Sequence, residues 1–256
     1  MTSAAGGRTA LVTGAGNGLG RAIARALGAA GARVILVGRT ESTLASTARL
    51  MDIDHAPRIC VTDVSDPAAV AALAAELADQ EISILVNNAG IGGVVKPLVE
   101  IEPEEWDEVF DANVRSIYLM CRAFLPAMMS AGIGDVVNIA SASGKRPLAR
   151  RTPYTASKMA VIGLTRTLAT EVGEHGVRVN TLSPGYVRGP RMERNFRLES
   201  ESTGVPADQI EAAFASRTAM KRLITEEEVA AALLAMLAMT ALTGADIDLS
   251  AGMIAP

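Results

Sequence analysis

The chain has 256 residues, of which 49% are hydrophobic and 20% are charged, and its formal net charge is −4. A high apolar fraction with little net charge excludes intrinsic disorder, and the acidic excess excludes a globally basic surface for nucleic acid. Only two cysteines and two histidines are present, and the two cysteines are far apart in sequence. They predict no disulfide framework and no metal site, and they are typical of a cytoplasmic protein.

No segment predicts export or membrane insertion. Residues 1–8 are small and polar and lack the apolar core of a signal peptide. The most apolar helical stretch, residues 229–242, is too short to span a bilayer and follows a run of acidic residues that suits the first turn of a buried helix. We therefore expect no membrane partner.

Short apolar runs alternate with stretches of helical spacing along most of the chain. The expected strands are 9–12, 34–37, 59–61, 84–86, 136–139, 177–182 and 245–249. The expected helices are 19–30, 41–51, 65–80, 104–131, 154–172 and 226–240, with a break near Asn113 in the fourth of them. Asp66 is expected to cap the third helix, ahead of Pro67. Residues 186–223 are expected to be irregular.

The expected strands are apolar throughout rather than alternating, so each needs cover on both of its faces. Helices between successive strands supply that cover. The pattern therefore predicts an α/β fold with a Rossmann-like doubly wound parallel sheet, flanked by helices on both faces, in a single domain over residues 1–256. A (β/α)₈ barrel has similar length and alternation and is the alternative fold.

A glycine-rich turn separates the first expected strand from the first expected helix. Residues 13–20 read Thr-Gly-Ala-Gly-Asn-Gly-Leu-Gly. Glycines permit a tight turn and a close approach of the backbone to a pyrophosphate, and the helix start directs N–H groups and a positive dipole end at the anion. The alternative is a tight loop without a ligand. The strand–turn–helix context favours a dinucleotide site with contacts from Gly14, Asn17, Gly18, Leu19 and Gly20.

The end of the second strand bears on the choice of cofactor. NAD-binding proteins of this class usually place an Asp or Glu there for the ribose hydroxyls. This chain has Arg39, whose planar, permanently charged guanidinium suits a 2′-phosphate, although a solvated surface arginine is the alternative. We therefore favour NADP(H) over NAD(H), with NAD(H) still possible because Asn17 occupies the turn position where a basic residue would reinforce the preference.

Three residues form a candidate catalytic cluster. Tyr154 and Lys158 are one helical turn apart and lie on the same helix face, where the ammonium favours the phenolate. Ser141 follows the fifth strand and emerges at the carboxyl edge of the sheet, where such folds bind ligands. A Tyr–Lys pair at this spacing is by itself most often a helix-surface pair, so its conjunction with the glycine turn carries the interpretation.

The sequence resembles the short-chain dehydrogenase/reductase family, in its single-domain branch, from Thr9 to about Met253. The resemblance is carried by a set of motifs in fixed order: Thr13-Gly14-x-x-x-Gly18-x-Gly20, Asp63, Asn87-Asn88-Ala89-Gly90, Asn113, Ser141, Tyr154-x-x-x-Lys158 and Pro184-Gly185. It implies hydride transfer between a nicotinamide cofactor and a secondary alcohol or ketone, with no metal. It also implies a homotetramer.

The resemblance also implies a role for each catalytic position. Tyr154 would be the general acid/base, and Lys158 would bind the nicotinamide ribose and stabilise the phenolate. Ser141 would hydrogen-bond the substrate oxygen. Asn113 would hold a water in a proton relay, or its side chain would only hydrogen-bond the backbone at a break in the helix, without a catalytic role.

The remaining implied roles concern the cofactor. Asp63 and Val64 would contact the adenine, and Asn88, Ala89 and Gly90 would line the cleft. Pro184, Gly185 and Val187 would cover the nicotinamide. Asn87 would either join this set or merely tie strands together.

Residues 186–223 are expected to form a lid over the substrate. The lid and the segment before Tyr154 are rich in basic residues, which suggests an anionic substrate or an acyl thioester on a carrier; a solvated, salt-bridged surface is the simpler alternative. A non-catalytic dinucleotide-binding redox sensor is the other functional alternative. The basic residues concerned are Lys145, Arg146, Arg150, Arg151, Arg188, Arg191, Arg194, Arg197 and Arg217.

Overall fold

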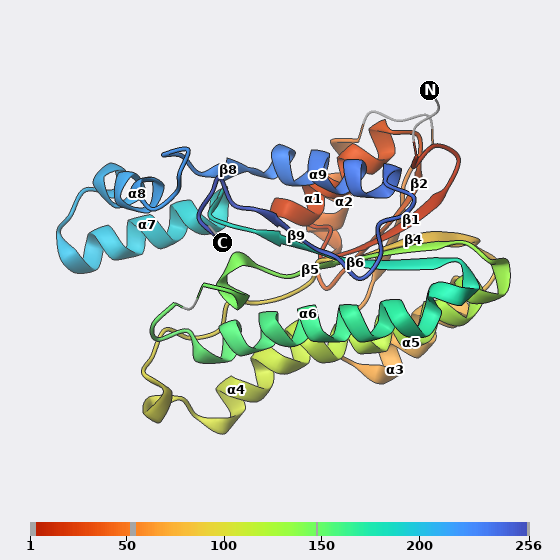
Figure 1. The fold of residues 1–256 in the computed structure, drawn as a ribbon, viewed down its shortest axis with the longest axis horizontal. Coiled ribbons are helices and arrows are strands. Elements are labelled where there is room, and N and C mark those ends of the chain that lie inside the picture. Colours follow the sequence, from red (N-terminus) through yellow and green to blue (C-terminus); the bar gives the residue numbers. More distant parts are fainter. Residues whose placement is uncertain (1–3, 52–54, 147, 255–256) are drawn as a thin grey trace.

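The computed structural model describes residues 4–51, 55–146 and 148–254, without the side chains of residues 191, 198 and 202. Its central element is a seven-stranded sheet in the order β3-β2-β1-β4-β5-β6-β9, in which every neighbouring pair is parallel (Figure 1). The strands are β1 (Thr9–Thr13), β2 (Arg33–Gly38), β3 (Arg58–Val61), β4 (Ile82–Asn87), β5 (Gly134–Ile139), β6 (Val177–Pro184) and β9 (Asp246–Leu249).

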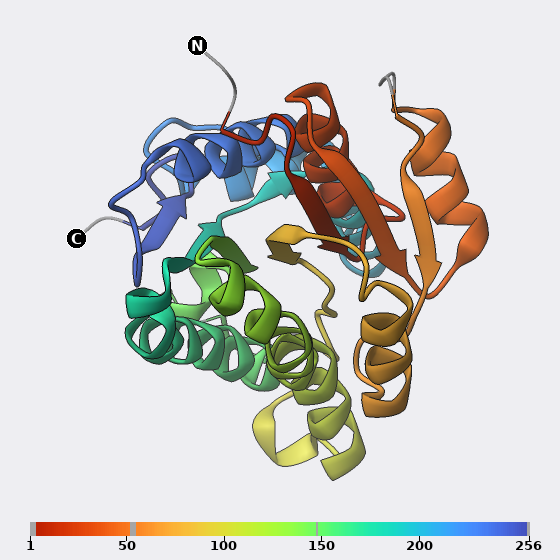
Figure 2. The ribbon, with the colours of Figure 1, turned by 90° about the vertical axis from the view of Figure 1, so that its right-hand side faces the viewer.

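Helices cover both faces of this sheet (Figures 1 and 2). One face carries α1 (Gly18–Ala29), α2 (Glu41–Arg49) and α9 (Glu226–Ala238). The other carries α3 (Pro67–Glu76), α4 (Pro103–Phe110), α5 (Ser116–Ala131) and α6 (Thr152–Val172). Each face has its own apolar core. The sheet is open, with β3 and β9 at its edges, so the doubly wound prediction is confirmed and the barrel alternative is wrong.

Local sequence explains where several helices begin. The Asp66 carboxylate accepts a hydrogen bond of 2.8 Å from the Ala68 N–H and Pro67 is the first residue of α3, as predicted. The helix ends at Glu76 rather than near residue 80. Thr225 and Glu228 form a reciprocal capping box at the start of α9. Short 3₁₀ turns lie at η1 (Leu98–Glu100), η3 (Ala142–Gly144) and η4 (Gly173–His175).

The predicted helix over 104–131 is two helices, and the break lies at Asn113 as predicted. A π-helical segment, η2 (Asp111–Arg115), separates α4 from α5, and Asn113 in it is fully buried. The sequence leaves two interpretations of the apolar stripe Leu119, Met120, Ala123, Phe124, Ala127 and Met128: a surface that packs against a second subunit, or a face turned to the core. Leu119, Met120, Phe124 and Met128 are buried within the chain, so the stripe mostly faces the core. That stripe therefore does not supply an intersubunit surface.

The prediction that residues 186–223 are irregular is wrong. They contain α7 (Pro190–Thr203) and α8 (Ala207–Ser216), which lie beyond one end of the sheet in Figure 1. The short strands β7 (Val187–Arg188) and β8 (Ile224–Thr225) pair at their base. Phe196 and Phe214 pack with Tyr186 in a small third core. Because charges cover the outer faces, the few apolar residues four apart were too sparse to be recognised as helical.

Among the described residues, no helix combines the length and the apolarity that crossing a bilayer requires. Residues 1–3 of the expected polar N-terminal segment lie outside the described residues. Cys60 and Cys121 are both free thiols buried in the chain, and burial raises the pKa of Cys121 to about 12. The Cys121 thiol is therefore protonated and unreactive at neutral pH.

Candidate active site

The glycine turn between β1 and α1 has the backbone that its sequence predicts. Gly14 and Gly18 adopt left-handed conformations, with φ of 65° and 51°. At Gly20 a β-carbon would overlap the Gly14 carbonyl oxygen. Only glycine at these positions lets the start of α1 lie close against the preceding turn.

Side chains from neighbouring elements hold this turn in place. The Thr13 hydroxyl accepts hydrogen bonds of 3.0 Å from the N–H groups of both Asn88 and Ala89. The Asn88 amide donates back to the Thr13 carbonyl at 3.0 Å. Thr47 of α2 donates to the Ala15 carbonyl at 2.8 Å. The turn is thus tied to β4 and α2, and the contribution of Thr47 carries no recognisable signal in the sequence.

The geometry fits a dinucleotide phosphate. Asn17 precedes α1, but its side chain makes no hydrogen bond to the first turn, so it does not cap the helix. The backbone N–H groups of Gly18, Leu19 and Gly20 belong to the first turn of α1. The N–H groups at a helix start have no carbonyl partner within the helix, and they are the donors that a pyrophosphate needs. The turn therefore retains unused donor capacity where the anion would lie.

The carboxyl ends of β2 and β3, which are neighbouring strands, bring Arg39 and Asp63 together. The Asp63 carboxylate accepts hydrogen bonds from the Ser65 hydroxyl at 2.6 Å and from the Ser65 N–H at 3.0 Å. These bonds, led by the hydroxyl and aided by the charge of Arg39, lower the pKa of Asp63 despite its partial burial. Val64 is buried in the core beside them. A guanidinium and a carboxylate therefore flank this end of the site.

Lys158 and Ser141 are both buried at the carboxyl end of β5. The Lys158 ammonium donates to the Ile139 carbonyl at 2.8 Å and lies 5.8 Å from the centre of the Tyr154 ring. The Ser141 oxygen accepts from the Ser143 N–H at 3.1 Å. Tyr154 is half-buried on the first turns of α6. The three predicted residues thus converge from β5 and α6 on one end of the sheet.

Asn113 joins the loop after β4 to α6. Its side-chain oxygen accepts from the Ile91 N–H at 2.7 Å, and its amide donates at 3.0 Å to both the Ile91 carbonyl and the Ser157 hydroxyl. Ser157 donates in turn to the Tyr154 carbonyl at 2.8 Å. Next to it, a β-carbon on Gly90 would lie 2.7 Å from the Asn113 side-chain oxygen. Asn113 therefore positions the helix that carries Tyr154, and Ser157 is a contributor that sequence reasoning missed.

Asn87 and the residues after β6 have structural contacts as well. The Asn87 amide donates to the Asn138 side-chain oxygen at 2.9 Å, which ties β4 to β5.

The chain after β6 lies close to β9. The Gly185 N–H donates to the Leu249 carbonyl at 2.8 Å, and a β-carbon on Gly185 would lie 2.8 Å from Ser250 Cα. Pro184 is buried and Val187 is half-buried. The chain after β6 is thereby held close to β9 on its way to the lid.

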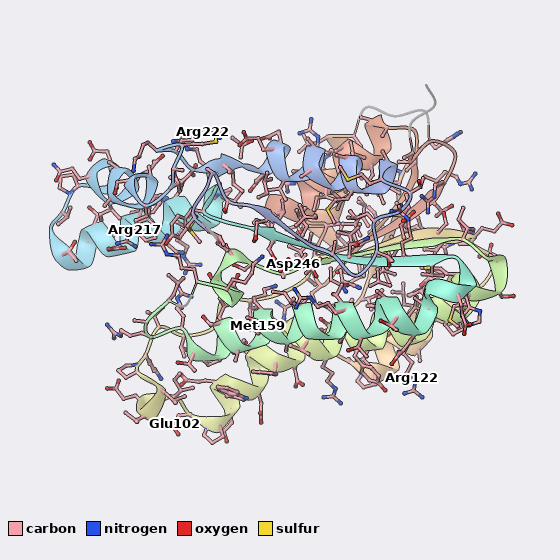
Figure 3. All side chains as sticks on the ribbon, in the orientation of Figure 1. Glu102, Arg122, Met159, Arg217, Arg222 and Asp246 are labelled. Carbon is pink, nitrogen blue, oxygen red and sulfur yellow. The ribbon has the colours of Figure 1, made fainter. Side chains whose placement is uncertain are left out.

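The basic residues near the site divide into two groups. Lys145 forms ion pairs with Asp246, at 2.8 Å, and with Asp248 on β9. Arg146 donates to the carbonyls of Arg217 and Met253; Arg217 lies on the lid side of the molecule in Figure 3, whereas Asp246 lies at the sheet. The side chains of Lys145 and Arg146 therefore hold segments of the chain together.

Arg151 lies three residues before Tyr154, and its guanidinium donates to the Gly92 carbonyl at 3.1 Å. The side chain of Arg191 lies outside the described residues.

Comparisons with known proteins define the class. A family model described as short chain dehydrogenase matches residues 8–201. A galactitol 2-dehydrogenase of Rhizobium johnstonii is 36% identical over 96% of this chain and 95% of its own. A structure of L-sorbose reductase from Gluconobacter frateurii, complexed with NADPH and L-sorbose, has a TM-score of 0.93 and 27% identity over 99% of both chains. A structure of actinorhodin polyketide ketoreductase with NADPH has a TM-score of 0.91 and 30% identity, also over 99% of both chains.

An open parallel sheet with a dinucleotide turn and a Ser–Tyr–Lys cluster at its carboxyl edge is the architecture of a nicotinamide-dependent oxidoreductase. The chain belongs to the short-chain dehydrogenase/reductase family, whose members interconvert secondary alcohols and ketones with NAD(P)(H).

Proposed function

We propose that Tyr154 is the general acid/base of a reversible alcohol–ketone interconversion. The observation that carries this proposal is the convergence of Ser141, Tyr154 and Lys158 at the end of β5, on the same edge of the sheet as the glycine turn. The bound nicotinamide supplies or accepts the hydride. Tyr154 donates a proton to the carbonyl oxygen in reduction and removes it from the alcohol in oxidation.

The other residues of the site support that proton transfer. Ser141 donates a hydrogen bond to the same substrate oxygen, where negative charge develops. The Lys158 ammonium, held by the Ile139 carbonyl, stabilises the phenolate form of Tyr154 and binds the nicotinamide ribose. Asn113 fixes the position of α6 through its hydrogen bond to Ser157, and in this proposal Asn113, in the π-helical segment η2, holds a water of the proton relay.

We infer that NADP(H) is the preferred cofactor. The support is Arg39 at the end of β2, where a guanidinium can pair with a 2′-phosphate, together with the NADPH complexes of two similar structures. Pro184, Gly185 and Val187 cover the nicotinamide in this proposal, and Asp63 and Val64 contact the adenine. In an Arg39→Ala variant, the preference for NADPH over NADH should fall about tenfold or more in kcat/KM, since one charge-assisted pair is worth ~1.5–3 kcal/mol.

The proposed substrate is a small polyhydroxylated alcohol or the corresponding ketose. The support is the galactitol dehydrogenase and the sorbose reductase among the similar proteins. A panel of sugar alcohols, ketoses and simple ketones with both NADP(H) and NAD(H) tests it. Turnover confined to a 3-oxoacyl thioester would favour the ketoreductase alternative, which the actinorhodin enzyme supports. Binding without turnover of any substrate would favour a redox sensor.

The hypothesis of an anionic substrate now rests on Arg151. Lys145 and Arg146 of the same segment serve structural contacts, whereas Arg151 lies at the start of α6, close in sequence to Tyr154. Turnover of charged and neutral ketones by Arg151→Ala distinguishes the cases. A selective loss on the charged ketone supports anion binding; equal losses on both assign Arg151 to holding the Gly92 loop.

We propose a cytoplasmic homotetramer in which α5 and α6 pack against their copies. The two buried free cysteines suit a reducing compartment. A groove between these helices is lined by apolar groups of Tyr118, Leu125, Leu164 and Leu168, and Tyr118 is 49% exposed in the single chain. Sedimentation of wild type and Leu164→Arg tests this. A tetramer that dissociates on substitution supports the interface, and a monomeric wild type contradicts it.

A further inference from the structure

Glu226, the first residue of α9, is packed against the glycine turn. A β-carbon on Gly18, where α1 begins, would lie 3.5 Å from a Glu226 carboxylate oxygen. The same oxygen lies so close to Gly189, which precedes α7, that a β-carbon there would overlap it. The half-buried Glu226 carboxylate therefore lies between the phosphate turn and the base of the lid.

Three charged groups from the surrounding elements act on this carboxyl. Glu227 follows it on α9, Glu193 lies on the first turn of α7, and Arg21 lies on α1. Burial is the main cause that raises the pKa of Glu226; Glu227 and Glu193 act in the same direction, and Arg21 opposes them. Arg21 is itself engaged with the Gly16 carbonyl at 2.6 Å and the Thr47 hydroxyl at 3.1 Å.

A carboxylate in this place is unfavourable for a dinucleotide. The turn at Gly14–Gly20 is suited to a pyrophosphate, and an anion a few ångströms away repels it in a partly desolvated site. A protonated carboxyl has no net charge, and it can donate a hydrogen bond to a phosphate oxygen. The two protonation states of Glu226 therefore differ in their affinity for the cofactor.

We propose that Glu226 links cofactor binding to proton uptake, so that the dinucleotide binds preferentially to the enzyme in which the Glu226 carboxyl is protonated. This inference rests on the proposed placement of the cofactor phosphates at the glycine turn. By linkage, a bound dinucleotide raises the pKa of Glu226 further. Affinity is then highest below the pKa of the free enzyme, falls as pH rises toward the pKa of the complex, and levels off at a lower value above it.

Dissociation constants for NADH and NADPH, measured by fluorescence from about pH 5.5 to about pH 8, test the proposal. NADH is the decisive probe because it lacks the 2′-phosphate, which titrates in this range. Wild type should bind NADH about tenfold more weakly at the upper end than at the lower end, equivalent to ~1.4 kcal/mol. Glu226→Gln should bind tightly with little pH dependence. Glu227→Gln, on the same helical turn but exposed, should keep the pH dependence of NADH binding, displaced to lower pH because Glu227 helps to raise the pKa of Glu226.

Calorimetry in two buffers of different ionisation enthalpy measures proton uptake directly on the unaltered protein. Uptake by wild type that is lost in Glu226→Gln supports the proposal. Absence of uptake by wild type across the whole pH range, or an unchanged pH dependence in Glu226→Gln, overturns it while leaving the dinucleotide site intact. Failure of wild type to bind either dinucleotide at any pH overturns the proposed function, and the inference with it.

Discussion

The glycine turn and residues 186–223, the proposed lid, are held by different interactions. The turn is fixed by hydrogen bonds from Thr13, Asn88 and Thr47, within close contacts that tolerate no added atom at Gly20. The lid is held by packing of Tyr186, Phe196 and Phe214 and by an exposed ion pair between Arg188 and Glu211.

This difference suits two tasks: cofactor binding by the turn and substrate binding by the proposed lid. The turn needs a backbone of one shape, because the phosphate donors are its own N–H groups. The lid contacts the rest of the chain through a small apolar cluster and two short strands, so its local opening costs less free energy than disruption of the sheet. Substitutions in the turn should therefore affect cofactor binding, and substitutions in the lid should affect substrate binding.

The largest effect is expected from Gly20→Ala. The new methyl group would overlap the Gly14 carbonyl oxygen, so the turn must open and its donors must move. We expect dinucleotide affinity to fall about 100-fold or more, equivalent to ~3 kcal/mol, in fluorescence titrations. Gly173→Ala is the matched control, since nothing lies within 4 Å of its added methyl group. Wild-type affinity in Gly20→Ala would show that the turn is not a rigid cradle.

Thr13→Val should reduce global stability by ~2–3 kcal/mol in urea unfolding. The substitution keeps the side-chain shape but leaves the part-buried N–H groups of Asn88 and Ala89 without their acceptor. Thr170→Val is the comparison, because the Thr170 hydroxyl is exposed and donates only to a carbonyl of its own helix. Equal unfolding midpoints for the two variants would contradict the importance of the Thr13 hydroxyl.

Phe214→Ala should mainly change substrate binding. The ring packs edge-on against Tyr186 at 4.8 Å and also contacts Phe196, so its loss loosens the lid. We expect KM for the substrate to rise about tenfold, with dinucleotide affinity within about twofold of wild type. A variant that loses cofactor affinity as strongly as substrate affinity would show that the lid and the turn are one cooperative unit.

The smallest effect concerns the junction of the lid with α9. The Arg222 guanidinium and the Thr225 N–H hydrogen-bond the Glu228 carboxylate and lower its pKa from 4.5 to about 2. Because the pKa is lowered in the folded state, this stabilisation is fully present above about pH 4.5 and is lost as pH falls toward 2. At neutral pH, Glu228→Gln should cost ~1 kcal/mol, since the pair is partly exposed.

Acid unfolding of the two proteins measures this contribution. The stability difference between wild type and Glu228→Gln should shrink as pH falls through that range. Glu227→Gln should show no comparable change, because Glu227 has no such partner among the interactions described for the chain. A constant difference from neutral to acidic pH would contradict the assignment.

Much of the site was predictable because its signals are local. The strand–turn–helix at residues 9–29, the Asp66–Pro67 helix start and the spacing of Tyr154 and Lys158 are each contained within one or two turns of chain. Short-range steric and hydrogen-bonding rules suffice to interpret them. The order of motifs along the chain then placed them at one edge of the sheet.

The contacts that hold these pieces together were not predictable, because they join distant segments. Thr47 reaches the glycine turn from α2, and Ser157 meets Asn113 across 44 positions. The helices α7 and α8 were missed for a different reason: Met192 with Phe196, and Ile210 with Phe214, are four residues apart, and among the described side chains these pairs supply most of the apolar face of each helix. Such a narrow stripe is not distinguishable from chance until Tyr186 and Met253 are seen to cover it.

The most direct test of the proposed chemistry is the fate of deuterium placed at both hydrogen positions of C4 of the reduced nicotinamide. Wild type, supplied with a ketone that it turns over, should deliver the label to the carbinol carbon, as seen by NMR of the product. Tyr154→Phe should bind the cofactor normally but form product about 10³-fold more slowly, in the range expected for loss of a general acid. With both C4 positions deuterated, unlabelled alcohol from wild type, or an undiminished rate in Tyr154→Phe, would contradict hydride transfer with Tyr154 as the acid/base.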